Sequence, residues 1–376
     1  MSDAAVKGAA VPPAGAMRGP SRHRLKLGIF MPNTGGGLSM SFAPTSTRPT
    51  FEYNRKVAVL ADRLDFDFLL PVGRWKGFGG VVDAEGESLE VFTWATAVAM
   101  ATRRIHVWST VHVPLIHPLM AAKMAATIQH ISGGRFGLNV VTGWNQVEIA
   151  MFGIKNRPPE LRHEQSHEWI EIVSRLWSER NFDYLGRHYE LLGAYLEPKP
   201  QPRPLLMNAG TSDASKDMSA KHMDYCFINP DRLESIPPLV ADVQGRAEAY
   251  GRTIGTCALA FVLARDTERA ARRALDTILR EADWVCVDNY IRIANVATHH
   301  NSEWEQDDLE RRMITGAAAP IVVGTPAQVA NRLAEYAETG IDGIMLGWHD
   351  FHRELGYFGR NILPLLEQRG LREPRA

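Results

Sequence analysis

The stretch IHVWSTVHVPLIHPLMAAKMAATIQHISGGRFGLNVVT, residues 105–142, decides the fold. Its first eight residues and its last eight are short apolar runs with β-branched residues, which is typical of strands. Between them, residues 118–131 have the length and the pattern of an amphipathic helix. A strand, a helix and a second strand in this order form a βαβ unit, and such units indicate a parallel sheet.

The same alternation continues on both sides of this stretch. Further strands are predicted at residues 25–31, 66–70, 205–208, 224–228, 257–263 and 341–346, and further helices at 51–64, 89–101, 162–177 and 325–339. At the start of the last of these helices, Thr325 has the side chain of a cap and Pro326 suits the first turn. Eight strands followed by helices predict an α/β fold, a (β/α)₈ TIM barrel with insertions.

Three segments depart from the alternation. Residues 181–204, NFDYLGRHYELLGAYLEPKPQPRP, predict a hairpin insertion that ends in a proline-stiffened connection. Residues 284–319 are polar and interrupted and contain no predicted strand, so we expect this insertion to form a lid. Residues 1–24 are rich in Ala, Pro and Gly and predict a disordered tail. Residues 25–376 would then form a single domain.

The composition argues against several kinds of partner. The 42 Lys and Arg residues balance the 43 Asp and Glu residues, and no basic stretch could follow a phosphate backbone, so we expect no nucleic acid partner. No run approaches the roughly 20 apolar residues of a membrane span. The 3 cysteines are scattered and lack a CxxC spacing, which suits a reducing cytoplasm and argues against disulfides or a thiolate metal site.

Polar residues lie at the ends of the third and fourth strands, at the face where barrel active sites are found. Thr110 ends the third strand, and Asn139 lies inside the apolar run of the fourth, where an amide costs free energy unless it is hydrogen-bonded. Both have a structural interpretation too, Asn139 as a satisfied core amide and Thr110 as an ordinary strand residue. Trp144, at the mouth of the fourth strand, could wall a flat aromatic ligand or pack in the core.

A candidate phosphate site follows the fifth strand. Residues 208–213, NAGTSD, open a helix, and its small residues let backbone N–H groups approach an anion whose charge the helix dipole favours. Gly210, Thr211 and Ser212 are the candidate ligands, although the same residues would also make an ordinary helix cap. Arg162, in the predicted loop after the fourth strand, could add a charged contact.

Motifs for metals and for nicotinamide are not evident. His349 and His352 lie close together, as do His299 and His300, but neither spacing matches a metal motif, so we expect no metal and interpret them as solvated loop histidines. No GxGxxG follows a strand and opens a helix. A built-in Rossmann nicotinamide site is therefore not predicted.

Several motifs resemble those of the bacterial-luciferase-like, two-component FMN-dependent monooxygenases, and the resemblance covers nearly all of residues 25–366. The pyrimidine (uracil) monooxygenase members of that family are resembled by PTFEYN (49–54), GFGG (77–80), ISGGRFG (131–137) with Asn139, and TGW (142–144). The dimethyl sulfone monooxygenase members are resembled by PNTGG (32–36), YNRK (53–56), GTP (324–326), YFGR (357–360) and LPL (363–365).

This resemblance implies an activity. The family takes reduced FMN from a separate NAD(P)H-dependent flavin reductase and uses it with O₂ to oxygenate a small molecule, with cleavage of a C–S or C–N bond. Two other functions share the barrel and stay open, namely deazaflavin-dependent hydride transfer and flavin binding without catalysis. A barrel hydrolase or aldolase would need a Lys base or a metal cluster at the strand ends, and neither is evident.

The resemblance also implies roles for single residues. Asn139 and Thr110 would flank the reacting part of the flavin ring as catalytic residues. The remaining cofactor contacts are carried over to Gly73, Arg74, Glu148, Arg162, His163 and Ser212, of which the last three would hold the FMN phosphate. Two positions depart from the family. His163 stands where tyrosine is usual, which would make its charge vary with pH, and Gly73–Arg74 replaces the apolar–Lys pair of the pyrimidine members.

Assembly is predicted from the third helix and from the family. Ala121, Ala122, Ala125 and Ala126 would give that helix a face of small side chains that permits close approach of a second subunit. We therefore expect a cytoplasmic homodimer or homotetramer.

Overall fold

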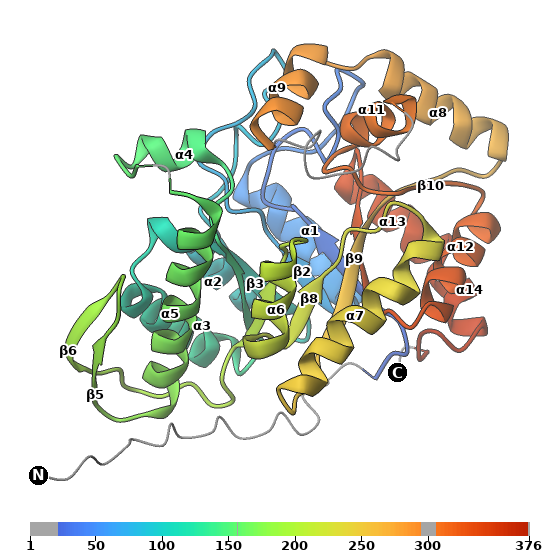
Figure 1. Ribbon diagram of the computed structural model, residues 1–376. Helices are drawn as coiled ribbons and strands as arrows, with labels where there is room; N and C mark the ends of the chain where they lie inside the picture. The colour runs from blue at the N-terminus through green and yellow to red at the C-terminus, as the bar shows by residue number, and fades with distance from the viewer. Residues whose placement is uncertain (1–21, 156, 295–305, 375–376) are drawn as a thin grey trace, which may run out of the picture.

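The computed structural model describes residues 22–155, 157–294 and 306–374. Eight parallel strands form a closed ring, because the last strand pairs with the first as well as with its other neighbour. The predicted (β/α)₈ TIM barrel is therefore confirmed (Figure 1). In ring order the strands are β1 (Lys26–Phe30), β2 (Phe68–Leu70), β3 (His106–His112), β4 (Phe136–Val141), β7 (Leu205–Asn208), β8 (Tyr225–Phe227), β9 (Gly255–Ala264) and β11 (Gly343–Gly347).

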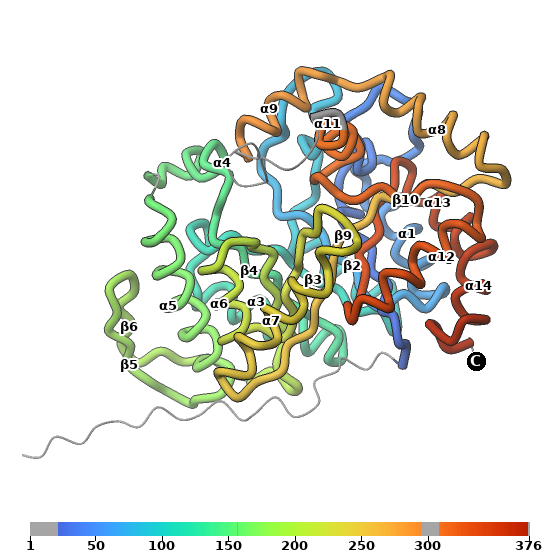
Figure 2. The backbone as a smooth tube through the Cα atoms, turned by 45° about the vertical axis from the view of Figure 1, so that its right-hand side comes forward, coloured from blue at the N-terminus to red at the C-terminus, as the bar shows by residue number. Residues whose placement is uncertain are grey.

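Helices surround this ring, and Figure 2 shows them on its outside. They are α1 (Phe51–Arg63), α2 (Val91–Ala101), α3 (Pro118–Ser132), α5 (Pro159–Ser178), α6 (Asp213–His222), α7 (Ile236–Ala249), α12 (Pro326–Glu338) and α13 (Phe351–Asn361), followed by the short α14 (Leu363–Gln368). The predicted cap of α12 is confirmed, since the Thr325 side chain accepts a hydrogen bond from Gln328 N. In the described part of the chain, no helix is long and apolar enough to cross a bilayer.

The interior of the barrel is filled by side chains that alternate along each strand. Phe68, Trp108 and Tyr225 pack edge to face, with ring centroids 5.7–6.3 Å apart. A Cβ at Gly137 would lie 2.5 Å from the Trp108 ring, so only glycine fits beside it. Because side chains two residues apart share a face of the sheet, Thr110 and Asn139 also point inward, one layer nearer the C-terminal ends of the strands. The period of the strands thus places both residues at the mouth of the barrel.

Two insertions were predicted in outline. The hairpin consists of β5 (Phe182–Leu185) and β6 (Glu190–Ala194) and is confirmed. Between β9 and β11 lie α8 (Glu268–Arg280), α9 (Trp284–Ala294), α11 (Gln306–Thr315) and the unpredicted β10 (Ile321–Gly324), which pairs with β9 outside the ring. Figure 1 shows these three helices at the end of the barrel where α4 (Gln146–Met151) also lies. Residues 295–305 of the predicted lid lie outside the described residues.

The four alanines of α3 do not form a free face. Ala121, Ala122 and Ala125 are completely buried and Ala126 is 2% exposed, within the core between the strands and the helices of the same chain. A second subunit cannot reach them. The sequence-based argument for assembly through this face was therefore wrong, because the small side chains let neighbouring elements of one subunit approach closely instead.

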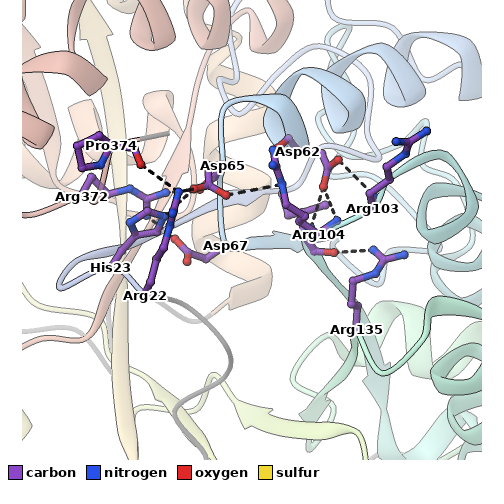
Figure 3. Close-up of polar contacts among 11 residues, drawn as sticks. Arg22, His23, Asp62, Asp65, Asp67, Arg103, Arg104, Arg135, Arg372 and Pro374 are labelled. Carbon is purple, nitrogen blue, oxygen red and sulfur yellow. Dashed lines mark hydrogen bonds and ion pairs between the residues drawn. The ribbon is translucent and has the colours of Figure 1, made fainter. Parts of the chain in front are cut away.

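A buried ion pair joins the C-terminal segment to the start of the barrel (Figure 3). Arg372 donates from Nη1 to Asp67 Oδ2 at 2.5 Å and to Leu25 O at 3.0 Å, and from Nη2 to Asp65 O. Asp67 also accepts from Leu27 N at 2.8 Å, so its charge is compensated from two sides. These contacts lie next to the N-terminal ends of β1 and β2, away from the mouth of the barrel.

The segment before β1 takes part in the same network. His23 is buried, accepts from Glu373 N at 3.0 Å through Nδ1, and contacts Asp65 Oδ2 at 3.1 Å through Nε2. Burial lowers the pKa of His23, which favours the neutral ring that this pattern requires. Arg22 and Arg24 form ion pairs as well. Residues 1–21 of the predicted disordered tail lie outside the described residues, and their disorder stays a prediction.

Replacing Arg372 by alanine is expected to lower the free energy of unfolding by about 3–5 kcal/mol, because Asp67 would remain as an unpaired buried charge. Arg24→Ala is the matched control, since its ion pair with Glu338 is exposed and such pairs contribute little. Urea denaturation followed by circular dichroism measures both variants. Equal, small effects would show that Arg372 does not hold the two ends of the chain together.

Candidate functional site

Asn139 and Thr110 lie opposite each other on neighbouring strands, as predicted. The register pairs Thr110 of β3 with Asn139 of β4, and Asn139 Nδ2 donates to Thr110 Oγ1 at 3.2 Å. Thr110 Oγ1 in turn donates to Pro71 O at 2.6 Å, beyond the end of β2. Both side chains are buried, Asn139 at 3% exposure and Thr110 at 7%.

This chain of hydrogen bonds fixes the direction of the Asn139 amide. The Thr110 hydroxyl has one proton, which it uses in the hydrogen bond to Pro71 O, so towards Asn139 the hydroxyl oxygen can only accept. The amide NH₂ therefore faces Thr110. Asn139 Oδ1 is buried and has no hydrogen-bond partner among the residues that the structure describes. An acceptor in this state is a candidate ligand-binding atom, and the satisfied core amide is not what the structure shows.

The segment after β2 packs directly against Thr110. A Cβ at Gly73 would lie 2.6 Å from Thr110 O, so this close approach requires glycine. His112 Nε2 donates to Gly73 O at 2.9 Å, and burial lowers the pKa of His112, so its ring is neutral. A cavity of about 90 Å³ is lined in part by Gly73, Arg74, Thr110 and His112. The structure thus brings three of the predicted site residues together.

Arg74 belongs to a buried cluster of charges. Its Nε donates to Glu85 Oε2 at 2.5 Å and its Nη1 to Glu148 Oε2 at 3.1 Å. The other oxygen of Glu148 accepts from Trp75 N at 2.6 Å and from Lys76 N at 3.1 Å. Glu148, predicted to contact the cofactor, therefore holds the loop that carries Arg74 in place.

Two aromatic rings lie against this guanidinium, and a third packs on both of them. Arg74 Cζ lies 4.9 Å from the ring centroid of Phe78 and 5.1 Å from that of Trp144, distances at which cation–π attraction contributes. Tyr290 of α9 lies 4.4 Å from Phe78 and 6.2 Å from Trp144, measured between centroids. Trp144 is half-buried and packs against the inner core, which is one of the two roles that the sequence left open, and contact with a flat ligand stays a prediction.

Arg162 lies in the first turn of α5 and not in a loop, because α5 begins at Pro159, three residues earlier than predicted. Its Nη1 donates to Gly143 O at 2.5 Å, while its Nε is buried without a partner among the described residues. The side chain also lines a cavity of about 180 Å³ together with Lys155, Arg157 and Gln165. Two further cations beside Arg162 favour an anion there.

His163 follows Arg162 on the same turn. Within the described part of the chain, its Nδ1 is buried without a partner. Burial, then Arg162 and His167, lower the pKa of His163, so its ring is neutral near pH 7 and charges only under more acidic conditions. His167 Nδ1 and His222 Nε2 lie 3.2 Å apart and connect α5 to α6. Arg162 and His163 therefore lie on the helix next to the predicted phosphate turn.

The turn itself is an anchored helix start. Asn208 donates to Val140 O at 2.6 Å and accepts from Gly210 N at 2.9 Å, so the turn is attached to β4. A Cβ at Gly210 would lie 2.2 Å from Ser215 Oγ, which excludes larger residues. Ser212 is the cap of α6, and Thr211 is exposed. The ordinary cap is thus present, and the α6 N-terminus stays available to an anion.

The predicted solvated histidines need a correction. His349 is buried, and its Nε2 contacts Ala43 O at 3.0 Å and Pro44 O at 3.1 Å, so it joins two segments of backbone. It follows β11 directly, where a loop was correctly predicted but burial was not. His352 is exposed, and His299 and His300 lie outside the described residues. Over the described ranges, no group of three metal-binding side chains is found.

Two site residues were missed from the sequence. Glu85 lies in the loop between β2 and α2, and Tyr290 lies in the predicted lid, more than 200 positions from Arg74. Neither contact follows from a helix or strand period, because Glu85 lies in an irregular loop and Tyr290 lies on α9, whose position relative to the barrel the sequence pattern does not give. GFGG at residues 77–80 was the only signal nearby, and it marked the loop without indicating its acidic residue.

Comparison with known proteins shows the family of the chain. The family model described as luciferase-like monooxygenase matches residues 25–343. The FMNH₂-dependent dimethylsulfone monooxygenase of Pseudomonas putida is 32% identical over 352 residues, which are 92% of this chain and 96% of that protein. The pyrimidine monooxygenase RutA of Pseudomonas syringae pv. syringae is 32% identical over 356 residues, 92% of this chain and 97% of that protein.

Among solved structures, the long-chain alkane monooxygenase LadA superposes with a TM-score of 0.83 at 21% identity, over 93% of each chain, and shows the fold alone. The family match and these relatives define the class of the chain, an oxidoreductase of the flavin-dependent monooxygenase class. The chain belongs to the luciferase-like monooxygenase family. The predicted family and enzyme class, and with them the predicted flavin cofactor, are confirmed.

Proposed function

We propose that this chain uses reduced FMN and O₂ to oxygenate a small molecule that contains a C–S or C–N bond, with the reduced flavin supplied by a separate NAD(P)H-dependent reductase. The observation that carries the proposal is the buried, unpartnered Oδ1 of Asn139 at the mouth of the barrel. The relatives support it, since one is named for dependence on FMNH₂ and acts on dimethylsulfone and the other acts on a pyrimidine.

The residues present fit the cofactor. Reduced FMN has an N–H at the ring position that oxidised FMN leaves as a bare acceptor, and Asn139 Oδ1 offers the matching acceptor. For the phosphate, the chain offers the unpartnered Arg162 Nε and His163 Nδ1 and, on the neighbouring helix, the Ser212 start of α6. Gly73, Arg74 and Glu148 shape the region next to Thr110.

When bound, reduced FMN supplies the electrons that activate O₂ for insertion of one oxygen atom into the substrate. Asn139 would accept a hydrogen bond from the ring N–H of reduced FMN through its amide oxygen, and the amide itself neither gains nor loses a proton. Thr110 acts as a positioning residue, because its hydroxyl sets the direction of that amide. Phe78, Trp144 and Tyr290 exclude water from the neighbouring charges, as the chemistry requires. The insertion that carries Tyr290 is proposed to act as the lid of the single 25–376 domain.

The enzyme is proposed to assemble through α2. This helix, VFTWATAVAMA, contains no charged residue, yet Thr93 and Met100 are exposed, and Thr96 and Ala97 are half-buried. A surface helix normally presents charged or polar residues to solvent, so a face of this kind favours contact with a second copy. A cytoplasmic homodimer or homotetramer follows, and the three buried cysteines, all unpaired, support the cytoplasm.

The function is tested by supplying the full-length protein with reductase, NADH, FMN and O₂ and measuring products by mass. Sulfones and N-heterocycles are the substrates to offer. We expect an oxygenated or cleaved product with at least one of them, and no NADH consumption by the protein without reductase. Rapid NADH oxidation by the isolated protein would contradict the proposal.

Asn139→Ala is expected to lower the oxygenation rate by roughly a hundredfold, since removing one preorganised polar group of an active site costs about 2.7–4 kcal/mol of transition-state stabilisation. More of the reduced flavin should then be lost as H₂O₂, while circular dichroism shows an intact fold. Thr110→Val should act in the same direction and more weakly. An unfolded Asn139 variant would restore the core-amide interpretation, and full coupling of O₂ to product would mean that the oxygen site lies elsewhere.

Arg162→Ala is expected to weaken binding of reduced FMN by roughly tenfold or more, because a hydrogen bond to a charged group contributes about 1.5–3 kcal/mol. Anaerobic fluorescence titration measures the dissociation constant. Arg175→Ala is the control on the same helix, since Arg175 pairs with Glu179 at the other end of α5. An unchanged constant for Arg162→Ala would show that the phosphate is anchored elsewhere.

Ala97→Glu is expected to convert the oligomer to a monomer, because it places a charge at the centre of the uncharged face of α2. Light scattering at micromolar concentration measures the mass. Leu192→Glu on the hairpin is the control, since Leu192 is 82% exposed and, like Ala97, is an apolar residue at the surface. A monomeric natural protein, or dissociation by the hairpin variant alone, would contradict assembly through α2.

A further inference from the structure

Two carboxylates share one guanidinium beside Thr110. Arg74, Glu85 and Glu148 are only 9%, 6% and 1% exposed. Over the described residues, no second Lys or Arg side chain forms an ion pair with either carboxylate. With all three groups ionised, the cluster therefore has one positive and two negative charges in a region of low polarity. A surplus of this kind acts strongly on any charged group that comes near.

The neighbouring groups do not compensate this surplus. Burial raises the pKa of Tyr290 and raises that of Cys286 to about 11, and burial lowers the pKa of His112, so all three are neutral near pH 7. Burial also raises the pKa of Glu85, and Glu148 raises it further, while Arg74 opposes both. The cluster thus has a net charge of zero when Glu85 is protonated and of minus one when Glu85 is ionised. It has no net positive charge in either state.

The cluster adjoins the cavity next to Thr110, where a substrate beside the bound flavin would lie. Gly73 packs on Thr110 O, and Arg74 lines the same 90 Å³ cavity as Thr110 and His112. Two of the guanidinium nitrogens already donate to carboxylates at 2.5 and 3.1 Å. An anion that bound the remaining N–H groups of Arg74 would bring a third negative charge next to Glu85 and Glu148, and this repulsion costs free energy. An uncharged molecule meets no such cost.

We infer that this cluster selects uncharged substrates and rejects sulfonates and carboxylates, with Glu85 as a specificity-determining residue. The inference rests on the proposed function and narrows its substrate class to sulfones, amides and uncharged N-heterocycles. Glu85 acts through its charge and through its hold on Arg74. Its neighbour Glu87 is exposed and forms no ion pair among the described residues, so it offers a matched control in the same loop.

The test uses two pairs of probes that differ in charge and hardly in shape: dimethyl sulfone with methanesulfonate, and nicotinamide with nicotinate. Ligand-observed NMR on the full-length protein at pH 8.5, with and without saturating FMN, gives the affinities. We expect the uncharged member of each pair to bind at least about tenfold more tightly, since unit charges a few ångströms apart interact strongly at protein dielectric values. Equal affinities, or no binding of either uncharged probe, would overturn the inference.

Glu85→Gln should lower the ratio of the affinities of the uncharged and the charged probe at least about fivefold. Glu85→Asp, which keeps the charge, should have the ratio of the natural protein, and Glu87→Gln should leave the ratio unchanged. An unchanged preference in Glu85→Gln would also overturn the inference. If Glu85→Gln does not fold, the preference of the natural protein and of Glu85→Asp still decides. The proposed monooxygenase activity fails separately, through absence of product in the reductase-coupled assay, because the binding experiment requires no turnover.

Discussion

The hydrogen bond between Asn139 and Thr110 is the constraint on which the mouth of the barrel depends. Two polar side chains among apolar ones must satisfy each other, and the register of β3 and β4 places them directly opposite. The Thr110 hydroxyl donates a hydrogen bond to Pro71 O, which connects the end of β2 to the same chain of bonds. Three strand ends are thereby held in a fixed relation, and a single acceptor, Asn139 Oδ1, is left over at the open side.

The loop after β2 depends on that relation and on α9. Asp283, at the start of α9, accepts from Val81 N and Val82 N at 2.7 Å each, and a Cβ at Gly80 would lie 2.5 Å from its carboxylate. The loop then presents Glu85 to Arg74 with a backbone φ of +63°, a strained conformation for a residue other than glycine. The insertion between β9 and β11 therefore helps to position a charge inside the site, through the loop that Asp283 holds. A displacement of α9 would therefore displace this loop and alter the contact of Glu85 with Arg74.

The barrel and the Asn139–Thr110 pair were predictable because both follow from the period of parallel strands. Alternation places Thr110 and Asn139 inward, and closure places all strand ends on one face. Contacts made by the irregular loop and by the insertion were not predictable. Glu85 reaches Arg74 from the loop, and Tyr290 of α9 packs against the Phe78 and Trp144 rings that cover it. The strand β10, which pairs with β9 outside the ring, was not predicted either. The alanines of α3 show a third limit, because a small-residue face does not say whether its partner lies within the same chain.

The two ends of the barrel differ in how completely their buried polar groups are paired. Around Arg372 and Asp67, the backbone and side chains supply partners from both ends of the chain, which is typical of a region built for stability. At the other end, Asn139, Arg162 and His163 each keep a buried polar atom without a partner in the described structure. His106, at the start of β3 beside Asp67, and Trp108 in the barrel interior do so too. Burial lowers the pKa of His106 to about 4, so its ring stays neutral and the cost of burying it is reduced. For Arg162 a neutral form does not exist at physiological pH, so its unpartnered nitrogen supports the proposed contact with the flavin phosphate.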